Sequence, residues 1–300
     1  MKWERCLNKR RARIRKRRRE SSTSLPGSTK SWCSDIATRC GATTPRTAFR
    51  TRMLGTPMSE SRTTLYLERN IFACPTKRHW VFLDVNRDKY LCLNRLEFDC
   101  LGSRLKGFAE ARQTLSNISP ASPADLVSLE NELIKAGILT TNIEHSNAVT
   151  RVDVPAPSRI LQKLSRPLTK GRVISRLPAF MYGCWKADRG LRENPFYKTI
   201  GDLVRRKQHA RTTHIQQRSR RIMQSVCAFN SLRLLYPRPY LCLFDSLALF
   251  EMLSLHGDFP TLVFGVTTDP FHAHCWLQDE NTVLNDSPST VRSYTPIMCV

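Results

Sequence analysis

The sequence of 300 residues is 41% hydrophobic and has a formal net charge of +23, from 48 Lys and Arg against 25 Asp and Glu. This length suffices for two modest domains, and no apolar run reaches the roughly 18 residues of a membrane span. The eleven cysteines include no C-x-x-C pair, which argues against a structural zinc site. Their odd number, without a secretory signal, favours the reducing cytoplasm.

The positive charge is concentrated at the start of the chain, where residues 1–60 carry 16 basic and 4 acidic side chains. Arg, Ser and Thr dominate residues 1–58 and hydrophobic periodicity is weak, so a disordered basic extension is predicted there. Three interpretations remain open: a nucleic-acid-binding arm, a solvated tail without a role, or a segment that is not translated because synthesis starts at Met53 or Met58.

Residues 59–145 are predicted to form a small α+β domain. The strand-like runs HWVFLDV at 79–85 and KYLCLN at 89–94 flank the turn residues NRD and predict a β-hairpin. A short helix is expected over 95–105. A second helix is expected over 122–139, SPADLVSLENELIKAGIL, because leucines recur at helical spacing between an N-cap serine and a stop glycine.

A polar, proline-containing linker is predicted over 146–169. Residues 170–236 look mostly helical, and a further helix, CLFDSLALFEMLSLHG, is expected from 242 to the stop glycine at 257. Two strands should follow, TLVFGVT at 261–267 and AHCWLQ at 273–278.

Three residues of this last region have the types and order of a cysteine-based active site. Cys242 opens a predicted helix, whose N-terminus favours a thiolate. His274 lies on a strand that can pack beside that helix, and Asp286 follows after a short turn and can orient the imidazole. From residue types alone, the alternative of a buried cysteine and a satisfied core histidine is favoured. Cys275 is expected on the opposite strand face from His274, and no metal site is expected, although His272 shares the face of His274.

The stretches CLFDSLALFEML, VFGV, DPFHAHCWLQ, VLND and YTPI, within residues 225–300, resemble in one order the B proteins of lasso-peptide biosynthesis. These are cysteine peptidases with a transglutaminase- and papain-like fold that remove the leader from a ribosomal precursor. The resemblance implies such a domain over 170–300, no cofactor, and catalytic roles for Cys242, His274 and Asp286.

The segment IFACPTKRHWVFLDVNRDKYLCLN and the two helices after it look like the winged-helix-like, PqqD-like leader-recognition domain fused to many B proteins. In that case the leader adds as a strand to a sheet edge. Tyr90, Leu91, Leu93 and the helix over 126–138 are then the candidate substrate-binding surfaces. Ordinary core packing is the alternative for each of these side chains.

The expected function is therefore a cytoplasmic cysteine peptidase whose partners are the precursor leader and, as the resemblance implies, an ATP-dependent lasso cyclase. No P-loop sequence is present. Three alternatives stay open. The same thioester can pass to an amine, which is transamidation. The chain can be a non-catalytic module that binds and delivers the leader. It can also be a basic nucleic-acid-binding protein.

Overall fold

The fold is taken from a computed structural model. It describes residues 64–102, 105–106, 123–147, 152–160, 168–209 and 215–300. The predicted basic extension over 1–58 and the predicted N-cap Ser122 lie outside these residues.

The first described elements are strands and two helices: β1 (Tyr66–Glu68), β2 (Ile71–Pro75), β3 (His79–Asp84), β4 (Lys89–Asn94), α3 (Arg95–Leu101) and α4 (Pro123–Lys135). The predicted hairpin and both predicted helices are confirmed. Strands β2, β3 and β4 form an antiparallel sheet with β3 in the centre and β4 at an edge. Gly137 ends the second helix at φ +70°, a conformation that glycine adopts without strain.

Two short strands lie within the segment 146–169 that was predicted as a linker. Strand β1 pairs on one side with β5 (Leu139–Thr140) and on the other with β6 (Ser146–Asn147), after the short 3-10 helix η2 (Ile143–His145). Strand β7 (Arg159–Ile160) pairs in parallel with β10 (Thr282–Val283) of the second sheet. Strand pairing therefore ties residues 146–147 and 159–160 of this segment to the sheets.

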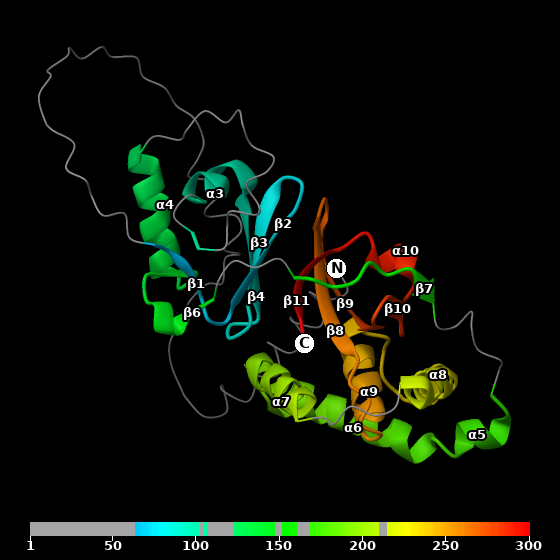
Figure 1. The fold of residues 1–300 in the computed structure, drawn as a ribbon. Coiled ribbons are helices and arrows are strands. Elements are labelled where there is room, and N and C mark those ends of the chain that lie inside the picture. The colour runs from blue at the N-terminus through cyan, green and yellow to red at the C-terminus, as the bar shows by residue number, and fades with distance from the viewer. Residues whose placement is uncertain (1–63, 103–104, 107–122, 148–151, 161–167, 210–214) are drawn as a thin grey trace, which may run out of the picture.

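The second half of the chain contains a group of helices followed by a sheet (Figure 1). The helices are α5 (Lys170–Ile174), α6 (Leu177–Glu193), α7 (Phe196–Gln208), α8 (Ile215–Leu232), the 3-10 helix η4 (Arg233–Leu235) and α9 (Cys242–Ser254). They are followed by β8 (Thr261–Thr268), β9 (Phe271–Asp279), β10, α10 (Pro288–Val291) and β11 (Thr295–Cys299). The sheet order is β11-β8-β9-β10-β7. The predicted helix at 242 and both predicted strands are confirmed.

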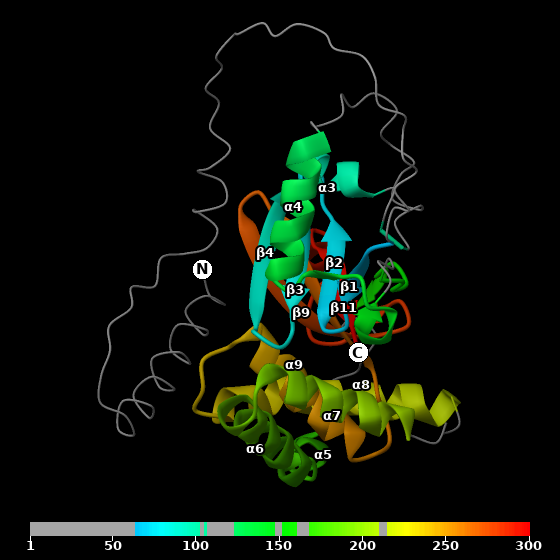
Figure 2. The same cartoon turned by 90° about the vertical axis from the view of Figure 1, so that its left-hand side faces the viewer.

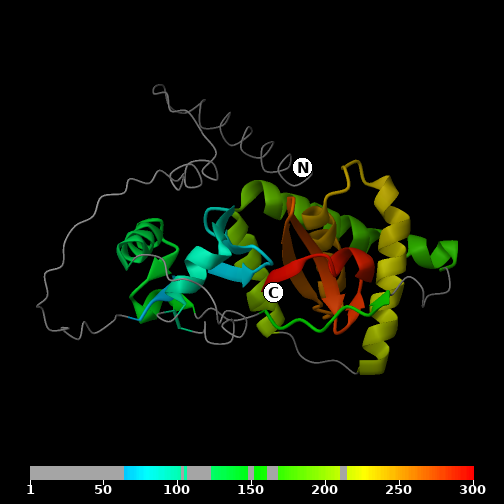
Figure 3. The same ribbon diagram turned by 90° about the horizontal axis from the view of Figure 1, so that it is seen from above.

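The β2-β3-β4 sheet and the five-stranded sheet β11-β8-β9-β10-β7 contribute to a common hydrophobic core. Side chains on β3 alternate in direction, and both directions are buried. Trp80 and Phe82 pack with α3 and α4 on one face, and α4 covers that face in Figure 2. Val81 and Leu83 on the other face join the core of the second half, together with α9 and β8. Strand β2 contacts β11, so the β2-β3-β4 sheet packs directly against the second half, and the two strands lie near each other in the view from above (Figure 3).

Helix α9 lies at the centre of the second half and is buried along most of its length. Helix α6 packs closely against it, and this approach requires a glycine. A Cβ atom added at Gly183 would lie 2.4 Å from the backbone oxygen of Ala248. In the described part of the chain, no helix combines the length and the apolar character needed to cross a membrane.

Gly183→Ala is expected to destabilise the protein by about 1–3 kcal/mol, because a backbone atom blocks the added methyl group and the two helices must separate. Gly201→Ala is the matched control in α7, where nothing lies within 4 Å of the added atom. It should leave stability unchanged or raise it by up to about 1 kcal/mol, through helix propensity alone. Urea denaturation measures both, and equal midpoints for the two variants would contradict this packing.

Candidate active site

Cys242 is the first residue of α9, after the N-cap residue Leu241. The N–H groups of the first helical turn have no partner within a helix, and the helix dipole is positive at this end. Both effects stabilise a negatively charged sulfur. The helix can hold this position because residues 246–253 are all buried in the core. The sequence thus folds a rigid, apolar helix whose N-terminus places the thiol beside β9, which α9 contacts.

His274 and Asp286 form a hydrogen-bonded pair next to this helix end. His274 extends from β9, and its Nε2 lies 2.6 Å from Oδ2 of Asp286. The other carboxylate oxygen accepts a hydrogen bond of 2.6 Å from the backbone N–H of Ser287. Because Nε2 faces the carboxylate, Nδ1 is the ring nitrogen available to the thiol. The carboxylate therefore sets the tautomer and the orientation of the imidazole.

The charges of these three groups support one another. A hydrogen bond from the Cys275 thiol and the contact with His274 outweigh burial and lower the pKa of Cys242 to about 5. Burial opposes the charged form of His274, but the hydrogen bond to Asp286 and the contact with Cys242 raise its pKa to about 9. The pKa of Asp286 is lowered despite burial, mainly by its hydrogen bond with His274. The three residues predicted from the sequence are thus brought together, as a thiolate–imidazolium pair with a carboxylate behind it.

Cys275 belongs to this site as well. It was expected on the opposite strand face from His274, and it is there, fully buried, but that face packs against α9. Its sulfur lies 4.0 Å from Oγ of Ser246, one turn after Cys242. Burial, followed by the hydrogen bond to Cys242, raises the pKa of Cys275 well above its usual range. Burial therefore disfavours a charged Cys275, whose thiol donates to Oγ of Ser246 and whose proximity helps to lower the pKa of Cys242.

Ser246 and Asn285 connect the helix, the strand and the loop that carries Asp286. The Asn285 side chain donates a hydrogen bond of 2.8 Å to Oγ of Ser246 and accepts one of 2.8 Å from the backbone N–H of Leu277. The Ser246 hydroxyl in turn donates to the backbone oxygen of Cys275, at 3.3 Å. These bonds fix the spacing between the thiol and the imidazole.

Two aromatic rings enclose His274. The Trp276 ring stacks near it with centroids 6.1 Å apart, and the Tyr294 ring lies at 5.1 Å. Gly265, the partner of His274 across β8 and β9, makes room for both. A Cβ atom there would lie 2.9 Å from each of these side chains. Trp276 is 2% exposed, so it both packs in the core and covers the imidazole.

The loop before Cys242 is held by a buried ion pair. The Arg233 side chain is 3% exposed, and its Nε donates to Oδ1 of Asp245 at 2.5 Å. The same guanidinium donates to the backbone oxygens of Arg238 and Pro239, at 3.1 and 3.0 Å. The second oxygen of Asp245 accepts from the backbone N–H of Leu241, at 3.0 Å. Asp245 therefore joins the catalytic helix to its preceding loop, a role that its position in the first helical turn did not reveal.

Arg233→Gln is expected to lower the free energy of unfolding by about 3–5 kcal/mol, because it leaves the largely buried Asp245 carboxylate without its counter-ion. Arg189→Gln is the control, since its pair with Glu193 is more than half exposed and should contribute less than about 1 kcal/mol. Denaturant titration compares the two. A loss for Arg233→Gln no larger than that for Arg189→Gln would contradict a structural role of this pair.

The three residues predicted to bind substrate do not share one surface. Leu91 and Leu93 of β4 face α4, where Leu93 is buried and Leu91 is partly buried. Tyr90 points to the opposite face, into the core that contains Cys242 and Ala273, and its ring lies 5.5 Å from that of Phe271. Burial, then the nearby sulfur of Cys275, raises the pKa of Tyr90. Tyr90 is thus the one of the three that lies toward the catalytic residues.

His272 and His274 share a strand face, as expected. Within the ranges that the structure describes, no three His, Cys, Asp or Glu side chains are grouped as metal ligands would be.

Several residues of the site were not singled out from the sequence, although they lie in the stretches that carry the family resemblance. Ser246 belongs to CLFDSLALFEML, Asn285 to VLND and Tyr294 to YTPI. The three catalytic candidates and these supporting residues all fall between 233 and 294. Their position within these stretches was the sequence signal that could have identified them as residues of the site.

Comparison with known proteins identifies the second half of the chain. A family model described as the transglutaminase-like superfamily matches residues 192–299. The matched range includes Cys242, His274 and Asp286. No curated protein and no solved structure matches the chain. Residues 192–299 thus form a transglutaminase-like domain, and the superfamily to which this domain is assigned includes cysteine peptidases.

Proposed function

We propose that this protein is a cysteine peptidase that removes the leader from a ribosomally made lasso-peptide precursor. The observation that carries the proposal is the arrangement of Cys242 and the hydrogen-bonded pair of His274 and Asp286 at the N-terminus of a buried helix. A thiolate next to an oriented imidazolium is the form in which a cysteine attacks a peptide carbonyl.

The reaction follows from the positions of these groups. The Cys242 sulfur attacks the scissile carbonyl, and the oxyanion that forms is stabilised by first-turn N–H groups of α9, that of Cys242 included. His274 gives its proton to the leaving amine, and the amide C–N bond breaks to leave a thioester. His274 then accepts a proton from water, whose oxygen attacks the thioester, and the thiolate is released. Asp286 keeps the imidazole oriented through both steps.

Leader capture is proposed to take place on residues 59–145, acting as a PqqD-like recognition domain. Strand β4 supports this proposal because it is the edge of the β2-β3-β4 sheet, and an extended leader can add to such an edge. The contact between Tyr90 of β4 and Phe271 of the catalytic hairpin also supports it, because a leader bound along β4 would lie near the active site. The alternating Leu91 and Leu93 face α4 and stabilise the strand.

The proposal includes a partner and a location. An ATP-dependent cyclase would take the released core peptide, as in the systems that the motifs resemble. A cytoplasmic location is supported by the seven cysteines whose side chains the structure describes, all of which are free thiols, and by a nucleophile that requires a reduced sulfur.

Product analysis tests the proposal. The purified protein is incubated with the short precursor peptide encoded beside its gene, with and without an added primary amine, and the products are identified by mass spectrometry. Hydrolysis yields the leader with a free C-terminal carboxylate and an intact core. A leader that carries the added amine instead identifies transamidation. No cleavage of any neighbouring precursor, together with intact delivery to the cyclase, would establish the non-catalytic alternative.

A protein that starts at Met58 is expected to cleave the precursor at a rate within about threefold of the full chain, because no catalytic residue lies before this position. The alternative of a nucleic-acid-binding protein predicts instead that this truncation removes a strongly salt-dependent affinity for RNA or DNA. Cleavage rates and binding titrations at several salt concentrations distinguish the two. A tenfold loss of cleavage in a folded truncated protein would show that the extension takes part in the reaction.

A further inference from the structure

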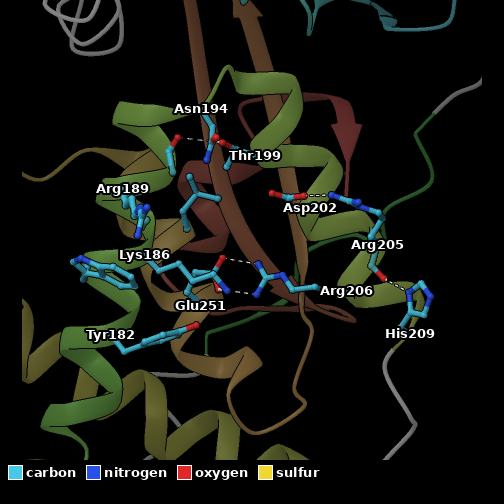
Figure 4. Close-up of a pocket in the computed structure, with 14 residues that line it drawn as sticks. Tyr182, Lys186, Arg189, Asn194, Thr199, Asp202, Arg205, Arg206, His209 and Glu251 are labelled. Carbon is cyan, nitrogen blue, oxygen red and sulfur yellow. Dashed lines mark hydrogen bonds and ion pairs between the residues drawn. The ribbon is translucent and has the colours of Figure 1, made fainter.

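A second concave site lies between helices α6, α7 and α9, away from the catalytic cysteine (Figure 4). The cavity has a volume of about 580 Å³. Glu251 of α9 lies at its floor, nine residues after Cys242. With a rise of 1.5 Å per residue, the floor is about 13 Å along the helix from the thiol. The proposed peptidase reaction uses none of the residues that line this cavity.

The floor of the cavity holds more positive than negative charge. The Glu251 side chain is 7% exposed and pairs with Lys186 at 2.9 Å and with Arg206 at 2.5 Å. One carboxylate therefore serves two cations that come from different helices, as Figure 4 shows. The other lining cations, Arg189 and Arg205, each have a carboxylate partner of their own in Glu193 and Asp202. The surplus charge thus lies at Lys186 and Arg206, both of which are about two-thirds buried.

An aromatic wall stands beside these cations. The rings of Tyr182 and Trp185 lie 6.1 Å apart, and the Lys186 ammonium is 5.5 Å from the Tyr182 centroid. Trp185 is 52% exposed, although a tryptophan usually buries most of its surface. The Arg189 guanidinium lies 5.6 Å from the centroid of the Trp185 ring. The rest of this exposed indole provides a surface on which a flat group can stack while an attached anion reaches the floor.

We propose that this cavity binds a small phosphorylated molecule. The phosphoryl group would lie against Lys186 and Arg206. Its negative charge would balance the second of these two positive charges, because Glu251 supplies only one negative charge. Guanidinium and ammonium donors match phosphate oxygens, and partial burial strengthens the attraction relative to open solvent. A ring attached to the phosphate would stack on Trp185. The inference stands on this cavity alone and does not depend on the proposed peptidase activity.

Calorimetric titration of the full chain at about 150 mM salt tests the proposal, because this salt screens the diffuse attraction of the basic protein for anions. The probes are inorganic phosphate, phenyl phosphate and adenosine 5′-monophosphate. Phenyl phosphate and adenosine 5′-monophosphate should both bind more tightly than inorganic phosphate. The difference in affinity between these two probes reports the size of the group that fits against Tyr182 and Trp185. Each bound probe should also raise the melting temperature.

Three variants locate the binding. Lys186→Gln should lower the affinity for every probe about tenfold or more, because a charged hydrogen-bond donor is lost. Trp185→Ala should lower the affinity for the ring-bearing probes about fivefold or more and leave the affinity for inorganic phosphate unchanged. Lys198→Gln removes the same charge from an exposed position on α7 outside the cavity and should change no affinity beyond twofold. Circular dichroism verifies that each variant is folded.

Either of two results would overturn the proposal. One is that no probe binds the wild-type protein with a dissociation constant below about 1 mM. The other is an equal loss of affinity for Lys186→Gln and Lys198→Gln, which would show that the anions respond to the overall charge and not to the cavity.

Discussion

Cys242→Ala is expected to abolish precursor cleavage, with a residual rate below about one-thousandth of the wild type. The variant keeps the helix and the pair of His274 and Asp286 but removes the thiol that the proposed mechanism uses to form the thioester. Mass spectrometry of the released leader measures the loss. The wild-type protein trapped during turnover should carry the acyl group on Cys242, and the variant should carry none.

Cys299→Ser is the control for this variant, because Cys299 is exposed on β11 and contacts none of the catalytic residues in the structure. Its cleavage rate should stay within about twofold of the wild type. Cys275→Ser is unsuitable as a neutral control, since Cys275 donates a hydrogen bond to the catalytic sulfur. Release of the leader by Cys242→Ala at a rate near that of the wild type would rule out the proposed peptidase mechanism and favour a delivery module.

The second large effect concerns the thiolate–imidazolium pair. The cleavage rate should follow a bell-shaped dependence on pH, with half-maximal rates near pH 5 and pH 9. Below about pH 5 the Cys242 sulfur takes up a proton and loses its nucleophilicity. Above about pH 9 His274 loses the proton that the leaving amine requires. The two limits belong to the coupled pair, because each charge stabilises the other. Initial rates between pH 4 and pH 10 measure this profile.

His274→Ala should lower the cleavage rate by about 10²–10⁴-fold, because the proton donor and the positive charge are both lost. Iodoacetamide reacts with thiolates, so the pH dependence of Cys242 alkylation reports the sulfur separately from turnover. The midpoint should lie near pH 5 in the wild type and move upward in His274→Ala. Asp286→Ala should lose less activity, because it orients the imidazole and transfers no proton. An alkylation midpoint near 8.5 in the wild type would contradict the ion pair.

The shared core has a consequence for how the two halves can be tested. The first sheet and the transglutaminase-like half bury Val81 and Leu83 together with α9, so separating the two would expose apolar surface on both. Leader capture is therefore better examined with substitutions in the full chain than with fragments. Under the proposed function, a leader bound on β4 would contact β9 through Tyr90 and Phe271, whose rings lie 5.5 Å apart.

Local patterns were sufficient to determine the main elements of the protein. Alternating and helically spaced apolar residues predicted the hairpin of β3 and β4, helices α4 and α9, and the strand pair β8 and β9. They succeeded because these segments have matching propensity, turn residues and stop signals, with Gly137 and Gly257 ending the two helices at positive φ. The placement of Cys242, His274 and Asp286 on a helix, a strand and a loop could be predicted for the same reason, because local start and turn signals define those elements.

Only the tertiary structure decided what lies around those three residues. Strand alternation placed Cys275 correctly on the face opposite His274, but which partner that face meets depends on how α9 packs, and the face meets Cys242. Arg233 reaches Asp245 twelve residues away, and Lys186 and Arg206 converge on Glu251 from separate helices. Both faces of the β2-β3-β4 sheet are covered. Tyr90 therefore packs in the core that contains Cys242, whereas its neighbours Leu91 and Leu93 pack in the other core. Side-chain periodicity is a short-range property, whereas contacts between distant segments are set by the packing of the whole core.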